Sequence, residues 1–317
     1  APSATVAAAN GRPSPTPTPA SGAATFNLRE KSIIAAEIPK WSWGGFGEYL
    51  PSGYDSKASW PLVIFEHGKG ECTQTSTLSD AVYKNGPFAE MKKNANLRVP
   101  MIILAPQSNC SWNAANLDLF LDYAIKHYKV DPKRVYLTGL SLGGGGTAAY
   151  LDAHPDRIAA AAMIAQAGGF KEADTASNLL MYKVGVWIFQ GSADLTVGTG
   201  NAKSTELKLS NLVGNCKLSN ALTNIGTGIQ TGSIDTSTCK PVWVNGQTDL
   251  RDGKRVNPPY LLTWYPDRGH NIWPDVYRDP NLYQWFLSQS PTCGDTILVE
   301  LTSAASWAAA TTATSCT

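Results

Sequence analysis

Short runs of apolar residues recur along the middle of the chain, separated by polar or glycine-containing turns. They cover residues 61–66, 99–105, 158–164, 184–189 and 260–265, with another run beginning at 135. Runs of this length without polar alternation are typical of parallel strands covered on both faces of a sheet. We therefore expect a mostly parallel sheet, preceded by two extended segments between residues 26 and 54.

Helical spacing of apolar residues appears between several of these runs. Over 116–129 such residues recur every three or four positions, which predicts a helix capped by Asn116. A second helix is expected over about 142–153, and Asp279-Pro280 begins a third with an inward apolar face. Alternating strands and helices predict an α/β fold with right-handed crossovers and helices on both faces of the sheet.

Three segments depart from this alternation. Residues 1–24 are rich in Ala, Pro, Ser and Thr and lack the apolar surface that would offset ordering, so we expect a linker. Residues 201–259 are long, polar and rich in Gly and Thr, which indicates an insertion that overhangs the site. The predicted catalytic domain covers 25–290, and residues 291–317 form a C-terminal extension.

A serine lies between two glycines where the run from 135 ends. The sequence Gly139-Leu140-Ser141-Leu142-Gly143 fits the G-x-S-x-G nucleophile elbow, in which small residues allow a sharp turn from strand to helix. The run before the serine supplies the strand, and the expected helix over 142–153 follows it. Ser141 is therefore the candidate nucleophile.

A serine nucleophile needs an imidazole as base and a carboxylate that orients the imidazole. In hydrolases with this elbow the order along the chain is Ser, then Asp or Glu, then His. His270 follows the run at 260–265, and Asp194 follows the run at 184–189, so these two are the expected base and acid. Asp267 and Asp275 compete with Asp194 because they neighbour His270, although a carboxylate on a tight turn more often caps the turn.

The oxyanion of a tetrahedral intermediate needs two preorganised donors. One is expected from the N–H of Leu142, directly after the nucleophile. The other is expected from the turn His67-Gly68-Lys69-Gly70, through the N–H of Lys69. His67 itself is expected to be a structural ring.

Charge argues against several classes of partner. The chain has 26 Lys and Arg against 25 Asp and Glu, without a basic cluster, so neither nucleic acid nor an anionic membrane is an expected partner. The longest apolar run, 158–165, is far shorter than the roughly 20 residues of a membrane helix. We expect no cofactor and a monomer.

The cysteines indicate the compartment. Six are present, without C-x-x-C spacing or a pairing with histidines, so no metal site is expected and disulfides are favoured over free thiols in a cytosolic enzyme. The chain begins at Ala1 rather than Met, and we expect a secreted protein whose leader has been removed. Among about 15 connectivities, we favour nearest neighbours: Cys72 with Cys110, Cys216 with Cys239, and Cys293 with Cys316.

Five stretches between about residues 45 and 288 resemble the secreted α/β-hydrolase esterases. This group includes feruloyl and acetyl-xylan esterases, polyhydroxybutyrate depolymerases and related "predicted peptidase" proteins. The resemblance implies the α/β-hydrolase fold and places the triad at Ser141, Asp194 and His270. The stretches are Gly45-Phe-Gly-Glu-Tyr-Leu-Pro51, Val63-Ile-Phe-Glu-His-Gly68, Arg134-Val-Tyr-Leu-Thr-Gly-Leu-Ser-Leu-Gly-Gly-Gly-Gly-Thr147, His154-Pro-Asp-Arg157 and Gly269-His-Asn-Ile-Trp273.

Two tryptophans are candidates for contact with substrate. Trp112 follows a strand end and Trp273 lies three residues after His270, so both are expected near the catalytic face. An aromatic wall there suits a phenolic acyl group, a sugar ring or a polyester chain.

These features together favour a secreted serine carboxylesterase that works through an acyl-enzyme. Its expected substrate is an ester that can be polymeric, such as a feruloyl or acetyl ester of plant cell-wall polysaccharide. A polyester depolymerase or a serine peptidase could use the same triad. A non-catalytic carbohydrate-binding protein on a hydrolase fold is the remaining alternative.

Overall fold

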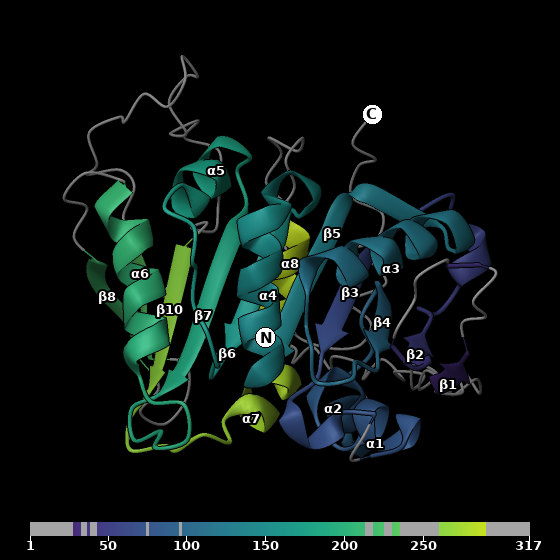
Figure 1. Cartoon of the computed structure of the whole chain (residues 1–317), viewed down its shortest axis with the longest axis horizontal. Coiled ribbons are helices and arrows are strands. Elements are labelled where there is room, and N and C mark those ends of the chain that lie inside the picture. Colours follow the sequence, from purple (N-terminus) through teal and green to yellow (C-terminus); the bar gives the residue numbers. More distant parts are fainter. Residues whose placement is uncertain are drawn as a thin grey trace, which may run out of the picture.

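Strands and helices follow one another from residue 28 to residue 288 in the computed structural model of the chain, and they alternate through its middle (Figure 1). The structure describes residues 28–32, 37–38, 43–73, 76–94, 97–212, 218–224, 230–234 and 260–289. No helix within these ranges is long and apolar enough to cross a membrane.

Within the described residues, ten strands form one sheet in the order β1-β2-β4-β3-β5-β6-β7-β10-β9-β8. The six central strands are parallel to one another, whereas the two strands at each edge pair antiparallel. The central strands are β4 (Ile102–Pro106), β3 (Trp60–Glu66), β5 (Val130–Leu140), β6 (Ala160–Ile164), β7 (Gly185–Gly191) and β10 (Tyr260–Tyr265). The edge strands are β1 (Leu28–Lys31), β2 (Phe46–Tyr49), β8 (Leu218–Asn224) and β9 (Gln230–Ile234).

Helices cover both faces of this sheet, as expected. Side chains of four helices and one sheet face form one apolar cluster, and those of the other four helices and the opposite face form a second. The first set is α3 (Ala114–His127), α4 (Leu142–Ala153), α5 (Thr175–Met181) and α6 (Gly200–Leu212). The second set is α1 (Leu78–Tyr83), α2 (Gly86–Lys93), α7 (Trp273–Arg278) and α8 (Pro280–Ser288). Three single turns complete the elements: η1 (Tyr54–Ser56), η2 (Lys69–Glu71) and η3 (Pro155–Arg157).

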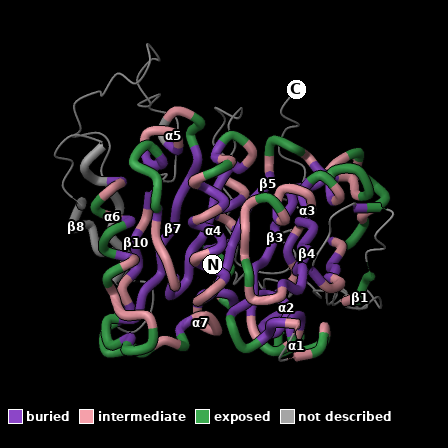
Figure 2. The backbone as a smooth tube through the Cα atoms, viewed as in Figure 1, coloured by how far each residue is buried: buried purple, intermediate pink, exposed green. Residues whose placement is uncertain are grey.

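Burial explains why the central strands have unbroken apolar sequences. All residues of β3, β4, β6 and β7 are buried, and Figure 2 shows these central strands as buried segments among the helices. A strand covered on both faces has no solvent side on which polar residues could alternate. The expected α/β class is thereby confirmed.

Two expectations about local structure were wrong in detail. β5 begins at Val130, five residues before the expected start, because Val130 pairs with Trp60 and the register then shifts between Trp60 and Leu62. The helix expected behind Asn116 begins earlier, since Asn113 is its cap and accepts a hydrogen bond from the Asn116 N–H at 2.8 Å.

The expected insertion is partly regular structure. Its described portion contains most of α6 together with β8 and β9, which extend the sheet beyond β10. Residues 213–217, 225–229 and 235–259 lie outside the described residues, as do the linker 1–24 and the extension 291–317. The domain boundaries therefore remain predictions.

Candidate active site

Ser141 lies at the turn between β5 and α4, in a conformation that few non-glycine residues adopt. Its backbone angles are φ 53° and ψ −114°, which costs about 1–3 kcal/mol at such sites. The Ser141 N–H donates to Ile164 O at 2.8 Å, and the Ala167 N–H donates to Ser141 O at 2.8 Å. Both bonds anchor the turn to the end of β6. The structure thus holds the expected elbow in place.

Glycine at position 143 is required by the same turn. A Cβ built on Gly143 would lie 2.1 Å from Glu66 O and 2.7 Å from His67 O. The first turn of α4 therefore packs directly against the backbone at the end of β3. Only a residue without a side chain allows this approach.

His270 connects Ser141 to Asp194. Its Nε2 lies 2.9 Å from Ser141 Oγ and its Nδ1 lies 2.8 Å from Asp194 Oδ2. An ionised carboxylate only accepts hydrogen bonds, so Nδ1 carries the proton and Nε2 accepts from the serine hydroxyl. The structure therefore brings together Ser141, His270 and Asp194, the three residues expected from the sequence. Their hydrogen bonds have the order found in a catalytic triad.

Neither competing carboxylate is hydrogen-bonded to His270. Asp267 is exposed, and the hydrogen bond that the structure shows for it runs from its backbone N–H to Ser192 Oγ at 2.8 Å. Asp275 forms ion pairs with Arg268 and Arg278. Asp194 is therefore the only one of the three candidate acids that is hydrogen-bonded to His270.

Asp194 is held ionised by a full set of donors, although it is only 3% exposed. Oδ1 accepts from the N–H groups of Thr196 at 2.9 Å and Val197 at 3.1 Å, and Oδ2 accepts from Gln190 Nε2 at 3.1 Å. Burial raises the pKa of Asp194, but the hydrogen bonds from His270, Val197, Thr196 and Gln190 outweigh it and lower the pKa. The carboxylate is thus charged and fixed when it faces the imidazole.

The two expected oxyanion donors lie on adjoining elements. Leu142 opens α4 and Lys69 opens η2, which follows β3 after His67 and Gly68. A Cβ built on Gly68 would lie 3.7 Å from Ser141 Cβ, so this turn packs beside the nucleophile. Across the described residues, neither the Lys69 N–H nor the Leu142 N–H has an acceptor in the protein. Both remain available to a ligand oxygen.

His67 is a structural ring within the same turn. Its Nε2 accepts from the Ser108 N–H at 2.9 Å, so Nδ1 carries the proton and donates to Gly68 O at 2.8 Å. Burial lowers the pKa of His67 to about 4, and the bond to Gly68 O offsets only part of this effect. The ring is therefore neutral near pH 7 and ties the turn to the end of β4.

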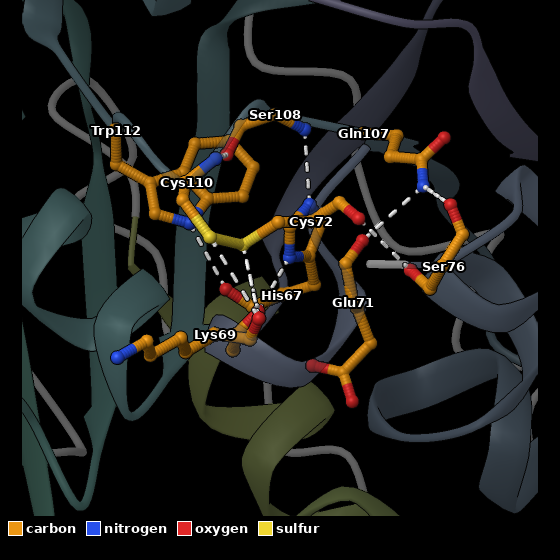
Figure 3. Close-up of a disulfide and its surroundings, with 10 residues drawn as sticks. His67, Lys69, Glu71, Cys72, Ser76, Gln107, Ser108, Cys110 and Trp112 are labelled. Carbon is orange, nitrogen blue, oxygen red and sulfur yellow. Dashed lines mark hydrogen bonds between the residues drawn. A yellow bond between two sulfur atoms is a disulfide. The ribbon is translucent and has the colours of Figure 1, made fainter. Parts of the chain in front are cut away.

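The disulfide between Cys72 and Cys110 clamps this turn from the outside (Figure 3). It joins the end of η2 to the segment after β4, with a Cα–Cα distance of 5.1 Å, and confirms the first of the three expected pairings. Lys69 O lies 3.0 Å from Cys72 Sγ and 3.7 Å from Cys110 Sγ. Disulfide sulfurs carry no proton, so these are packing contacts. The other four cysteines lie outside the described residues.

No protein-family model matches the sequence. Poly(3-hydroxyalkanoate) depolymerase C of Paucimonas lemoignei is 30% identical over 129 residues, which are 37% of this chain and 30% of the depolymerase. A thermostable esterase has a similar structure, with a TM-score of 0.53 and 19% identity over 84% of this chain and 63% of its own. This chain therefore spans less than two thirds of either protein.

Two further solved structures are matched over almost their whole length. The acetyl xylan esterase from Aspergillus awamori has a TM-score of 0.54 and 12% identity, covering 82% of this chain and 99% of its own. A mutant of the feruloyl esterase module from Clostridium thermocellum, complexed with sinapinate, has a TM-score of 0.52 and 15% identity, covering 89% and 94%.

The protein has the α/β-hydrolase fold. At these identities the structural likeness concerns the fold alone, and at that level it confirms the resemblance to the esterase group.

Trp112 and Trp273, the two tryptophans that the sequence suggests for contact with substrate, lie beside residues of the candidate site. Both are partly exposed. The Trp112 indole N–H donates to His67 O at 2.9 Å, and its ring packs on the His67 ring (Figure 3). Trp273 meets the His270 ring edge to face, with centroids 5.2 Å apart. Each indole therefore supports a residue of the site, and contact with substrate remains a prediction.

Sequence reasoning missed three polar side chains of the site. Gln190 donates to Asp194, as described above. Asn85 accepts from Trp273 Nε1 at 2.8 Å and donates to Glu71 Oε1 at 2.7 Å, which links the His270 side to η2. For Gln190 the available signal was a polar residue at the end of an apolar run, before the turn to Asp194. The sequence holds no comparable signal for Asn85 or Glu71.

Proposed function

We propose that the protein is a secreted serine carboxylesterase that hydrolyses carboxylic esters through an acyl-enzyme on Ser141. The observation that carries this proposal is the position of His270, which is hydrogen-bonded to Ser141 Oγ and to Asp194 Oδ2 at once. A serine hydroxyl becomes a useful nucleophile when an oriented imidazole can take its proton.

In the acylation step, Ser141 Oγ attacks the ester carbonyl carbon while its proton moves to His270 Nε2. The charge on the former carbonyl oxygen is met by the N–H groups of Lys69 and Leu142. Asp194 stabilises the imidazolium through Nδ1. The intermediate then collapses, the bond to the leaving alcohol breaks, and the alcohol oxygen takes the proton from His270 Nε2.

Deacylation repeats these roles with water as the nucleophile. His270 Nε2 takes a proton from the water molecule as its oxygen attacks the acyl-enzyme carbonyl. Collapse of the second intermediate releases the carboxylic acid and returns the proton to Ser141 Oγ. The same backbone donors serve both intermediates, so a single oxyanion site is sufficient.

The proposed substrates are feruloyl or acetyl esters of plant cell-wall polysaccharides. Two of the similar structures are an acetyl xylan esterase and a feruloyl esterase module, which supports this class. The partly exposed rings of Trp112 and Trp273 suit a phenolic acyl group or a sugar ring. The Cys72–Cys110 disulfide supports an oxidising, extracellular location, and a complete triad within one chain supports action as a monomer.

A polyester depolymerase is the second candidate. The 129-residue match to a poly(3-hydroxyalkanoate) depolymerase favours it. The same serine chemistry would cleave a polyester backbone, so the two candidates differ in substrate and not in mechanism.

A parallel screen tests both candidates. Release of acid is measured from feruloylated xylan, acetylated xylan, polyhydroxybutyrate, p-nitrophenyl butyrate and a peptide panel. We expect ester cleavage, loss of that activity in Ser141→Ala, and labelling of Ser141 by a fluorophosphonate. Turnover retained by Ser141→Ala would contradict the mechanism. Cleavage of peptides alone would indicate a peptidase, and binding of polysaccharide without any labelling would indicate a non-catalytic protein.

A further inference from the structure

Glu66 is a buried acid three residues before Lys69, one of the two proposed oxyanion donors. It ends β3, precedes His67, and is 0% exposed. Its Oε1 lies 2.9 Å from Thr147 Oγ1 on α4. Its Oε2 has no hydrogen-bond partner within the described part of the chain. The mechanism proposed above gives this carboxyl group no role.

The hydrogen-bond pattern indicates that this acid is neutral. Thr147 Oγ1 lies within hydrogen-bond distance of Glu66 Oε1, at 2.9 Å, and of Gly143 O, at 3.1 Å, but a hydroxyl has one proton. A carboxylate at Glu66 would compete with Gly143 O for that proton. A protonated Glu66 instead donates from Oε1 to Thr147, which leaves the threonine proton for Gly143 O, so both contacts of the threonine hydroxyl are satisfied.

Burial supports the same protonation state. It raises the pKa of Glu66 well above the ordinary value, and the hydrogen bond from Thr147 only partly offsets it. No ion pair to Glu66 exists among the residues that the structure describes. The neutral His67 ring is next to it in the chain, and the buried Tyr277 hydroxyl is close enough to interact with it electrostatically. An uncompensated carboxylate in such surroundings would be costly.

The chain around Glu66 makes room for its side chain. A Cβ built on Gly146 would lie 2.1 Å from Glu66 Oε2 and 2.5 Å from Trp112 Cβ. The glycine at 146 therefore accommodates the acid between β3, α4 and the segment that carries Trp112.

The Glu66 side chain connects the two elements that carry the proposed oxyanion donors. Lys69 follows Glu66 by three residues, and Leu142 directly precedes Gly143. The path from Glu66 through Thr147 to Gly143 O is the side-chain hydrogen-bond link that the structure shows between the end of β3 and the first turn of α4.

We propose that Glu66 is a positioning residue, a neutral acid whose hydrogen-bond chain through Thr147 sets the separation of the Lys69 and Leu142 N–H groups. This role rests on the proposed function, because it has an effect only where these two groups stabilise an oxyanion. Glu66 itself touches neither the ester nor the triad.

The test compares four variants on p-nitrophenyl butyrate. Glu66→Leu removes the acid, Thr147→Val removes the link with almost no change of shape, and Glu66→Gln keeps a neutral donor. Glu48→Leu is the matched control, since Glu48 is also a buried acid bonded to a hydroxyl, that of Tyr128, and lies on β2, two strands away from β3. Measured are kcat, KM, the midpoint of thermal unfolding, and inhibition by a trifluoromethyl ketone that forms a tetrahedral adduct with the serine.

Removing an oxyanion donor costs about 10²–10³-fold in kcat, so misplacing one should cost about 10- to 100-fold. We expect that loss in Glu66→Leu and Thr147→Val, with KM nearly unchanged and weaker binding of the ketone in proportion. Glu66→Gln should keep kcat within about threefold of wild type. Glu48→Leu should unfold at lower temperature yet keep kcat.

Three results would overturn the positioning role: wild-type kcat in both Glu66→Leu and Thr147→Val, an equal loss in Glu48→Leu, or a loss in Glu66→Gln as large as in Glu66→Leu. Thr147→Val keeps the proposal testable where Glu66→Leu does not fold. A parallel measurement on Ser141→Ala separates failure of the role of Glu66 from failure of the proposed function. If that variant is inactive, these results refute only the role of Glu66, whereas full turnover in Ser141→Ala refutes the proposed function itself.

Discussion

Gln190 and His270 donate hydrogen bonds to the same oxygen, Oδ2 of Asp194, at 3.1 and 2.8 Å. One carboxylate oxygen therefore accepts a hydrogen bond from a neutral amide and another from the imidazole that is proposed to take a proton. A donor that shares an acceptor in this way weakens the acceptor's hold on the other donor. Gln190 thus limits how strongly Asp194 favours the imidazolium.

Replacing Gln190 with methionine removes this donor and keeps the volume. We expect the acid limb of the kcat/KM profile to move to higher pH, because the hydrogen bond from Gln190 lowers the pKa of Asp194 and its loss raises that pKa. The value of kcat should fall several-fold, since Asp194 also loses a positioning contact. The control is Gln289→Met, another buried glutamine, which is hydrogen-bonded to Ser288 away from the site. An unchanged acid limb in Gln190→Met would contradict this account.

Asp194→Asn tests which carboxylate orients the base. An amide can donate to Nδ1 and so favours the wrong tautomer of His270, which should lower kcat by about 10⁴-fold with little change in KM. Asp267→Asn is the matched control, because Asp267 is exposed and neighbours His270 in sequence. It should keep nearly full activity. A large loss in Asp267→Asn with a small one in Asp194→Asn would reverse the assignment.

His67 should make the protein sensitive to acid. Its pKa falls from 6.5 in an ordinary environment to about 4 in the fold, so between these values the unfolded chain binds the proton more tightly. The stability that the neutral ring contributes is complete above pH 6.5 and is lost as the pH falls to about 4. The loss should reach about 3 kcal/mol.

Urea unfolding at several pH values measures this effect. His67→Asn should be less stable than wild type at pH 7, and the difference should shrink as the pH falls toward 4. His127→Gln, which removes an exposed histidine, is measured alongside as the control for loss of an imidazole at the surface. A constant difference between His67→Asn and wild type across this range would contradict the prediction.

Removing the disulfide should affect both stability and catalysis. Cys72 and Cys110 are 38 residues apart, and a cross-link of that span stabilises a fold by about 4 kcal/mol in the chain-entropy treatment. The double variant Cys72→Ala/Cys110→Ala should therefore unfold at lower denaturant concentration. Because the two sulfurs pack against Lys69 O, kcat should also fall at temperatures where the variant is folded. Unchanged kcat in the folded variant would show that the turn carrying Lys69 keeps its shape without the disulfide.

The three residues of the proposed triad could be predicted to lie together because each has a strong local pattern. Ser141 lies in a glycine-flanked pentapeptide after an apolar run, and Asp194 and His270 follow buried strands in the required order. The carboxyl ends of neighbouring parallel strands meet at one edge of a sheet, so residues that follow those strands come together. For these residues, position along the chain nearly determines position in space.

Residues that act between distant elements could not be found in this way. Asn85, just before α2, is hydrogen-bonded to both Trp273 and Glu71. Asn85 and Trp273 are 188 residues apart, and no spacing in the sequence predicts such a contact. The short helix α1 is a different case. Its capping box pairs Thr77 with Asp80, so the start of this helix does have a signal in the local sequence.

The pairing of β7 with β10 has a consequence for how this protein can change over time. These strands are hydrogen-bonded neighbours with Tyr265 opposite Gly191, although 68 residues separate β7 from β10 in the chain. A slip of two residues would move the His270 loop by about 6.6 Å relative to Asp194 and break their contact. The pairing of β7 with β10, and not the intervening chain, therefore sets the distance between Asp194 and His270. Insertions and deletions between α6 and β10 can accumulate, and the surroundings of the site can diversify, while the triad keeps its geometry.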